Sequence, residues 1–461
     1  MTERAVDMKD RLPLPVCLGF GVGTVGVSIM LNGVTAYFPA YMSTVLGKST
    51  EIAGYLLMAS KLYDAFADVV IGTLSDRTRS RWGRRRPYLL LGGILSALSF
   101  LMIFTPPAIS DNAVALYMFA ALVLYSTGYS LFNVPYMAMP SEMTASKYER
   151  SRLLSFRTLF VSIGQLLAMA GTASLISWGG GGAHGYAIMA YVMALVIVSA
   201  MVASFFGTAK APHLEVRAKP ESHIDAGQLR LLLRNRPFVL LLSAKIFQFL
   251  SFASVATTQL LFMLNVLGIG YVGQMQLAIT QNIVVAASMP LWLALERRMG
   301  KRNAYLIGIA CMCLGSISWV FASRDITMAG IIARGLVSGF GSGGMILLSI
   351  SMLADTLAYD RELTGLHREG LLSSVAAVIE KTAFALGVAV VGYVLNAAQY
   401  IPTRNGQIVQ QPDSAVSALY ACYALLPVAL FACNAMCIWF YTLGGRSTAP
   451  IPATDLAAEA L

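Results

Sequence analysis

The sequence predicts an all-α membrane protein with twelve transmembrane helices, arranged as two halves of six helices with both termini in the cytoplasm. Three observations predict this fold class. Hydrophobic residues form 57% of the 461 residues and charged residues only 12%, whereas a soluble protein carries roughly 25% charged residues. Apolar runs of about 20 residues, the length that crosses a bilayer, recur along the chain. Basic residues concentrate in every second connection between these runs.

Each apolar run is expected to form one span. The first six spans are expected at residues 14–45, 52–75, 87–106, 113–140, 152–178 and 185–208. The second six are expected at residues 237–264, 269–295, 303–322, 325–355, 369–396 and 415–442. A polar stretch between the two sets contains Pro212, Pro220 and Pro237, which interrupt regular structure. We therefore expect an N-terminal half (1–208), a cytoplasmic linker (209–236) and a C-terminal half with a short cytoplasmic tail (237–461).

The charges in the connections predict the orientation. Basic residues gather at 77–86, 147–152, 210–236, 296–302 and 361–368. The alternate connections carry only Lys48, Arg324 and Arg404. Because lysine and arginine favour the cytoplasmic side, the first set and both termini are expected inside. Orientation in the membrane then accounts for the net charge of +10, and no nucleic-acid partner is expected.

The sequence carries no pattern that indicates an enzyme. The cysteines lie in apolar segments without metal-ligand or disulfide spacing, at positions 17, 311, 313, 422, 433 and 437. The four histidines lie in loops, at positions 184, 213, 223 and 367. No phosphate-binding Walker motif is present. We expect no cofactor and no resident metal, and movement of a solute driven by an ion gradient or downhill. A polytopic membrane enzyme or sensor is the alternative class.

Two carboxylates stand inside the second expected span. Asp64 and Asp68 are four residues apart, so they share one helical face and repel each other. An ionised carboxylate at bilayer depth costs about 2.5–3.5 kcal/mol. The pair therefore predicts a site for a coupling ion, H⁺ or Na⁺. Lys61 offers a structural alternative, because it lies one turn before Asp64 and could pair with it, although Asp68 would then stay unneutralised.

The chain also repeats itself. A basic motif follows the second span of each half, reading DRTRSRWGRRRPYLL at 76–90 and ERRMGKRNAYLI at 296–307. Two six-helix halves with parallel repeats are typical of the major facilitator fold. In that fold the substrate binds between the halves near the midplane, and the halves rock around it.

Three blocks resemble the glycoside–pentoside–hexuronide:cation symporters. They read KLYDAFAD at 61–68 with GTLSDRTRSRWGRRRPY at 72–88, YSLFNVPY at 129–136, and DTLAYDRELTG at 355–365 with Glu380 and Lys381. Because the blocks run in order through both halves, the resemblance covers essentially the whole chain. It implies that Asp64 and Asp68 bind the cation and that Arg157 and Lys381 lie near the substrate.

Two departures from the family pattern affect the expected substrate. Asn133 stands where a well-known member has an aspartate that serves both cation and sugar, and no charged residue occurs between Leu14 and Tyr41 in the first span. These losses argue against galactoside recognition. The retained basic residues favour an anionic solute such as a uronide.

The expected roles follow from these blocks. The cation site comprises Asp64, Asp68 and Asn133, and the substrate site comprises Asn133, Arg157, Lys381 and Lys61. Further polar lining of the pocket is expected from Asn32, Tyr37, Gln281 and Asn282. A cytoplasmic latch between the halves is expected from Asp76, Arg84, Arg85, Glu142, Arg150 and Asp355, with Asp360 as a further member. Lys245 and Arg334 are interpreted as packing or gate partners.

Purely structural or topological roles are the alternatives for several of these residues. Lys381 could merely neutralise Glu380 or an aspartate across the bundle. Arg157 could extend towards the cytoplasmic surface, and each arginine of the latch could serve only to orient the chain.

The sequence thus predicts a symporter that couples H⁺ or Na⁺ to a glycoside, a sugar acid or a related small polyhydroxy solute by alternating access. We expect a multi-pass protein of the bacterial inner membrane that functions as a monomer in the lipid bilayer. The alternative is a sodium-coupled lysophospholipid carrier of the same fold. Eukaryotic carriers of that kind share the second-helix carboxylates and a similar lysine.

Overall fold

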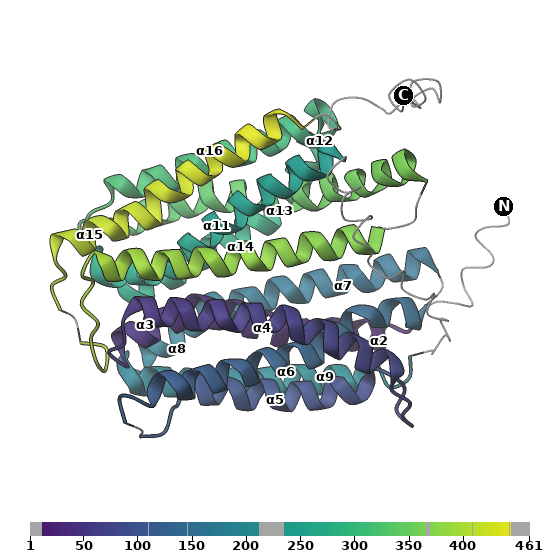
Figure 1. The fold of residues 1–461 in the computed structure, drawn as a ribbon, viewed down its shortest axis with the longest axis horizontal. Helices are drawn as coiled ribbons and strands as arrows, with labels where there is room; N and C mark the ends of the chain where they lie inside the picture. The colour runs from purple at the N-terminus through teal and green to yellow at the C-terminus, as the bar shows by residue number, and fades with distance from the viewer. Residues whose placement is uncertain are drawn as a thin grey trace, which may run out of the picture.

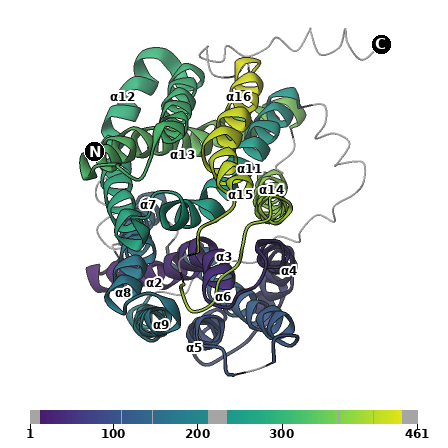
Figure 2. The same ribbon diagram turned by 90° about the vertical axis from the view of Figure 1, so that its left-hand side faces the viewer.

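The computed structural model describes residues 12–108, 110–144, 146–211, 235–365, 369–407, 409–441 and 443. Within these residues the regular structure is helical, apart from one isolated antiparallel bridge between Leu46 and Arg404. Figure 1 shows two groups of long helices, one from each half of the chain, with their axes running broadly in the same direction. Figure 2 shows the same groups from one end. The expected linker (209–236) and tail lie largely outside the described residues.

The first half is made of helices that follow the apolar runs closely. They are α2 (Leu14–Ser28), a π-helical turn (Ile29–Gly33), α3 (Val34–Thr44), α4 (Thr50–Arg77), α5 (Arg86–Phe104), α6 (Val114–Met143), α7 (Lys147–Leu166), a second π-helical turn (Leu167–Gly171), α8 (Thr172–Trp178) and α9 (Gly182–Gly207). The π-helical turns join α2 to α3 and α7 to α8 without a break, so each pair occupies one expected span.

The second half has the same character. Its elements are α11 (Arg236–Asn265), α12 (Gly270–Ser318), a 3₁₀ turn (Trp319–Phe321), α13 (Met328–Thr364), α14 (Glu369–Ala397), α15 (Asp413–Tyr420), a π-helical turn (Ala421–Leu425) and α16 (Leu426–Trp439). Gly300 interrupts α12 with φ 81° and ψ 160°, a conformation that glycine adopts readily. The expected spans 269–295 and 303–322 lie on the two sides of this break.

Capping residues explain several helix ends. The Ser49 side chain accepts a hydrogen bond from the Ile52 N–H at the start of α4, and Ser146 accepts one from the Glu149 N–H at the start of α7. Gly365, with φ 68°, ends α13. The helix continues nine residues past the expected end of the span at residue 355, beyond its apolar part and into a charged segment.

The described residues contain ten helices that are long and apolar enough to cross a membrane, with α12 counted once across its break. The protein is therefore a multi-pass membrane protein. Helix α4 is not among these ten although it has 28 residues. It carries Lys61, Asp64 and Asp68 in its middle, and these residues lower its mean hydropathy.

Contacts between the two halves close one end of the molecule, on the left in Figure 1. We call residues 398–407, which follow α14, the strap. Its main-chain N–H groups donate to the end of α3: Thr403 to the Ser43 carbonyl (2.7 Å), Asn405 to that of Val45 (2.9 Å) and Gly406 to that of Thr44 (2.8 Å). The strap therefore ties the second half to the first.

Two further contacts support this closed end. The Arg404 side chain lies 2.5 Å from the Asp111 carboxylate, and its hydrogen bond lowers the pKa of Asp111 below the usual value. Beside the strap, α4 packs against α14, and the Thr50 hydroxyl donates to the Gly392 carbonyl at 3.0 Å.

At the opposite end, the residues expected to form a latch make pairs within one half. Glu142 accepts from Arg84 at 2.5 Å and also from Arg85, which pairs with Asp76 at 2.8 Å. Arg150 donates to the Thr144 carbonyl at 3.4 Å. In the second half, Lys301 pairs with Asp355 at 2.6 Å. A latch between the halves therefore stays a prediction.

Helices α5 and α6 touch backbone to backbone, and glycine makes this possible. A Cβ atom at Gly92 would lie 2.6 Å from the backbone nitrogen of Phe132, and one at Gly128 would lie 2.8 Å from that of Ser96. Such distances are shorter than van der Waals contact, so any side chain here forces the helices apart.

We predict that Gly92→Ala lowers the melting temperature of the purified protein, with a loss of about 1–3 kcal/mol. The matched control is Gly72→Ala in α4, where an added Cβ meets only the Val134 side chain at 3.6 Å. Because alanine has a higher helix propensity than glycine, the Gly72→Ala variant should be as stable as the wild-type protein or more stable. Equal melting temperatures for the two variants would contradict close packing of α5 on α6.

Candidate functional site

An ionic cluster joins the two halves in the middle of the helices. The Lys381 ammonium on α14 lies 2.8 Å from Asp64 Oδ2 and 2.5 Å from Asp68 Oδ2, both on α4. Asp64 is buried, with 4% of the residue exposed. The two aspartates and the lysine named in the sequence analysis are thus brought together, and the lysine occupies the gap that the carboxylate pair left open.

Ser130 on α6 completes the cluster. Its hydroxyl lies 3.0 Å from Asp64 Oδ1 and 2.6 Å from Asp68 Oδ1. A hydroxyl has one proton to donate, so the two carboxylates share this donor. Together they place several oxygen atoms around one ammonium group, which is a donor set that suits a proton or a hard cation such as Na⁺. Sequence reasoning did not select Ser130, although a serine in an apolar block was a usable signal.

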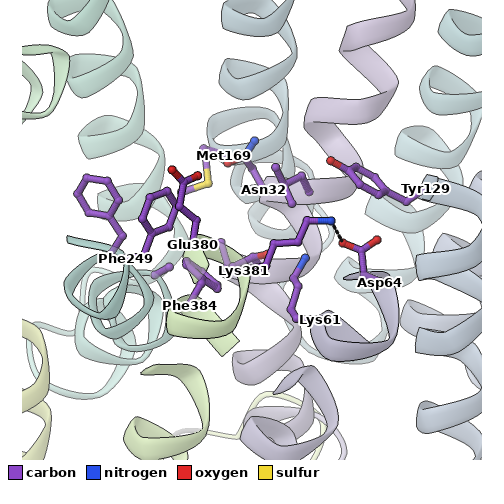
Figure 3. Close-up of a pocket in the computed structure, with 14 residues that line it drawn as sticks. Asn32, Lys61, Asp64, Tyr129, Met169, Phe249, Glu380, Lys381 and Phe384 are labelled. Atoms are coloured by element: carbon purple, nitrogen blue, oxygen red, sulfur yellow. Dashed lines mark hydrogen bonds and ion pairs between the residues drawn. The ribbon is translucent and has the colours of Figure 1, made fainter. Parts of the chain in front are cut away.

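A cavity of about 360 Å³ lies between the halves beside this cluster. We call it the central cavity. Its lining from the first half comprises Leu31, Asn32, Thr35, Ala36, Lys61, Asp64, Tyr129 and Met169. Its lining from the second half comprises Phe249, Phe252, Ala256, Glu380, Lys381 and Phe384. Figure 3 shows Lys61 and Lys381 near Asp64, with Phe249 and Glu380 on the opposite side from Tyr129. The volume is in the range of small-molecule sites.

Lys61 is a buried lysine that has no carboxylate partner among the described residues. The residue is 8% exposed and lines the central cavity. Its ammonium lies 5.8 Å from the centre of the Tyr125 ring. Asp64 pairs with Lys381 instead, and no described carboxylate lies within 4.0 Å of the Lys61 ammonium. Since an unpaired buried charge is costly, this ammonium is suited to receive an anionic group.

Two predicted site residues are not among those that line the central cavity. Asn133 follows Ser130 by three residues on α6 and is not in the lining. Arg157 on α7 is also outside the lining, and its buried Nε has no described hydrogen-bond partner. The roles of both residues in binding stay predictions.

Of the four residues expected as further polar lining, Asn32 lines the cavity. Tyr37 donates to the Met169 carbonyl. Gln281 donates to the Ser338 hydroxyl at 2.9 Å, and Asn282 donates to the Ala278 carbonyl at 2.9 Å. The side chains of Tyr37, Gln281 and Asn282 therefore donate hydrogen bonds to other groups of the protein and do not line the central cavity.

Lys245 and Arg334, the two basic residues interpreted as packing or gate partners, have definite contacts. Lys245 on α11 pairs with Glu380 at 2.6 Å, so Lys381 is not the partner of Glu380. The Arg334 guanidinium donates to the Ser318 carbonyl at 2.9 Å and lies 5.1 Å from the Trp319 ring centre. Arg334 therefore packs against a neighbouring helix end, as expected.

A comparison with family models decides the class of protein. The model described as MFS/sugar transport protein, where MFS denotes the major facilitator superfamily, matches residues 19–445. The chain belongs to this family. This MFS protein is therefore a membrane transporter and not an enzyme, and the glycoside–pentoside–hexuronide:cation symporter resemblance is confirmed.

Known proteins similar to this MFS transporter match over nearly its whole length. The isoprimeverose transporter of Lactiplantibacillus pentosus is 25% identical over 94% of this chain and 89% of its own length. The glucuronide carrier protein homolog of Escherichia coli (strain K12) is 27% identical, over 95% and 94%. A solved structure from work on proton-dependent oligopeptide transporters has a TM-score of 0.66 at 14% identity, over 93% of this chain and 98% of that chain, which shows the fold alone.

We predict that Lys381→Met strongly lowers the melting temperature of this MFS transporter. The change leaves two carboxylates side by side without their cation, and the Asp64 side chain is only 6% exposed. Removing the partner of a buried charge costs about 3–5 kcal/mol. The double variant Lys381→Met with Asp68→Asn should recover part of the loss, because one of the facing charges is removed.

Lys301→Met is the control for this comparison. Lys301 pairs with Asp355 near a helix end, where the two side chains are 24% and 40% exposed. An exposed pair is worth only about 0–1 kcal/mol. If Lys381→Met were no less stable than Lys301→Met, the cluster would not hold α4 against α14.

Proposed function

We propose that this transporter couples an inward-moving cation, H⁺ or Na⁺, to uptake of a sugar-derived solute that carries a negative charge, such as a glucuronide. The observation that carries the proposal is the buried amino group of Lys61, which lies in the central cavity and has no carboxylate partner in the part of the chain that the structure describes. It lies next to the Asp64–Asp68–Lys381 cluster. The cluster supplies the cation site, and Lys61 supplies the site for the anion of the solute.

Competition for the same carboxylates would couple the two binding events. Lys381 occupies the position between Asp64 and Asp68 that a cation would take. A bound H⁺ or Na⁺ neutralises one of the two carboxylate charges and thereby weakens their attraction for the ammonium of Lys381, which also lines the central cavity. This ammonium can then join Lys61 in binding the solute anion. Ser130, placed against both carboxylates, would remain as an oxygen ligand.

The chemistry of the cavity walls favours a sugar-derived solute. The aromatic rings of Phe249, Phe252, Phe384 and Tyr129 offer flat apolar surfaces for the C–H face of a sugar ring. Charged and amide groups between them can pair with hydroxyls and with a carboxylate. Two similar proteins are named for isoprimeverose and for glucuronide. These names do not favour the alternative of a lysophospholipid carrier.

We further propose twelve spans, which follow if α4 counts as a span and α12 is divided at Gly300. The basic connections would place the termini, and the end opposite the strap, in the cytoplasm of a bacterium, with the chain in its inner membrane. Alternating access would then require the strap to leave the end of α3. One chain supplies every residue of the proposed site, which suits a functional monomer.

The test is a thermal-shift panel on purified protein, with glucuronides, neutral glycosides and lysophospholipids, each with and without sodium and at two pH values. A ligand at 100 times its dissociation constant stabilises the folded state by about 2.7 kcal/mol. We expect glucuronides to raise the melting temperature most, and to do so in a sodium- or pH-dependent manner. Stabilisation by lysophospholipids alone would replace the sugar assignment with the lipid carrier.

We also predict that Asp64→Asn with Asp68→Asn abolishes accumulation of the solute against its gradient in proteoliposomes, while the protein still inserts. The two asparagine side chains keep the shape of the aspartates but lack the negative charge that would bind the cation. Asp325→Asn, in the connection before α13, is the matched control and should accumulate normally. Undiminished uphill uptake by the double variant would exclude these aspartates as the cation site.

A further inference from the structure

Glu380 stands at a wall shared by two cavities. It lines the central cavity, and it also lines a second cavity of about 450 Å³ within the second half. The second cavity is formed by residues of α11, α13 and α14, and it shares Phe249, Phe252 and Glu380 with the central cavity. In Figure 3 the Glu380 carboxylate lies on the side of the central cavity opposite Asp64 and Tyr129.

Lys245 forms an ion pair with the Glu380 carboxylate. Its ammonium donates to Glu380 Oε1 at 2.6 Å, and its side chain is 5% exposed against 26% for Glu380. The lysine is therefore enclosed while the carboxylate faces open space. No described residue donates a hydrogen bond to Glu380 Oε2, so this oxygen can accept one from a ligand.

The other carboxylate in the lining of the central cavity is already occupied. Asp64 Oδ2 accepts from Lys381 and Asp64 Oδ1 accepts from Ser130. Among the described residues that line the central cavity, Glu380 is thus the carboxylate that keeps an oxygen for a solute. Carboxylates accept hydrogen bonds from hydroxyl groups more strongly than neutral acceptors do.

We propose that Glu380 determines specificity by accepting hydrogen bonds from hydroxyl groups of the solute, and that Lys245 is the residue that positions it. This inference rests on the proposed function. The solute lies with its anionic group at Lys61 and its hydroxyl groups at Glu380, across the aromatic rings of Phe249, Phe252 and Phe384. Lys245 balances the charge of Glu380. The Glu380 carboxylate therefore does not repel the anionic group of the solute.

The experiment measures dissociation constants for a glucuronide and its single-deoxy analogues with wild-type protein and Glu380→Gln. An amide accepts fewer and weaker hydrogen bonds from hydroxyls, and hydrogen bonds to charged groups account for roughly 10- to 150-fold in affinity. We expect Glu380→Gln to bind the glucuronide at least about tenfold more weakly. We also expect one deoxy analogue to lose affinity with wild-type protein but not with this variant.

The position of Lys245 is tested in the same assay. Lys245→Met should weaken glucuronide binding in the same direction, and Lys245→Arg should restore it because the cation is retained. Glu296→Gln is the matched control, since Glu296 lies on α12 at 3.9 Å from Lys301 and outside both cavities.

Glu380→Asp preserves the charge balance and keeps the test open if Glu380→Gln fails to fold. Its shorter side chain should also reduce discrimination against the same deoxy analogue.

The outcomes separate this inference from the proposed function. Wild-type protein that binds no glucuronide or glycoside overturns both. If wild-type protein binds a glucuronide, and Glu380→Gln or Glu380→Asp binds it within twofold with the same discrimination among deoxy analogues, only the role of Glu380 is overturned. A merely structural ion pair would lower the melting temperature of the variants without changing which hydroxyl the protein recognises.

Discussion

The ammonium of Lys381 lies between two carboxylates on a neighbouring helix, and the arrangement of the two halves depends on it. Asp64 and Asp68 would repel each other on α4 if this group were absent. Since the lysine comes from α14, the same contact that neutralises the aspartates also draws the second half against the first. A ligand that competes for these carboxylates therefore acts on the packing of the halves as well as on the local charge.

Charge balance extends beyond this cluster. The described ammonium groups of Lys61, Lys245 and Lys381 face the three carboxylates of Asp64, Asp68 and Glu380 around the two cavities. With all six ionised, the set is neutral. An added anion alone would leave an uncompensated charge in a low-dielectric region, whereas an anion together with a monovalent cation would keep the set neutral. The same electrostatics that permits ionisable residues in the spans therefore favours paired movement of opposite charges.

Apolar length predicted the helices well, because the bilayer demands about 20 apolar residues for each span. The extension of α13 to Thr364 was not predicted, because it lies beyond the apolar run, whereas the break at Gly300 falls in the connection expected at residues 296–302. Asp64, Asp68 and Lys381 were selected as a site from their depth and the family pattern. Their mutual contacts, the engagement of Ser130 and the Lys245–Glu380 pair depend on helix rotation and on packing between distant segments, which spacing alone does not determine. The same helix rotation determines that Ser130, and not Asn133 one turn further along α6, contacts the two aspartates.

The strap has a consequence for how its sequence can vary. Its bonds to the end of α3 run from the N–H groups of Thr403, Asn405 and Gly406 to main-chain carbonyls. Asn405 (φ 53°) and Gly406 (φ 73°) have left-handed backbone conformations, and a Cβ atom at Gly406 would lie 2.8 Å from the backbone nitrogen of Gly182. Insertion or deletion of a residue between α14 and Thr403 would displace all three N–H groups relative to their acceptors at the end of α3. The closed end should therefore require both a constant length of this connection and glycine at position 406.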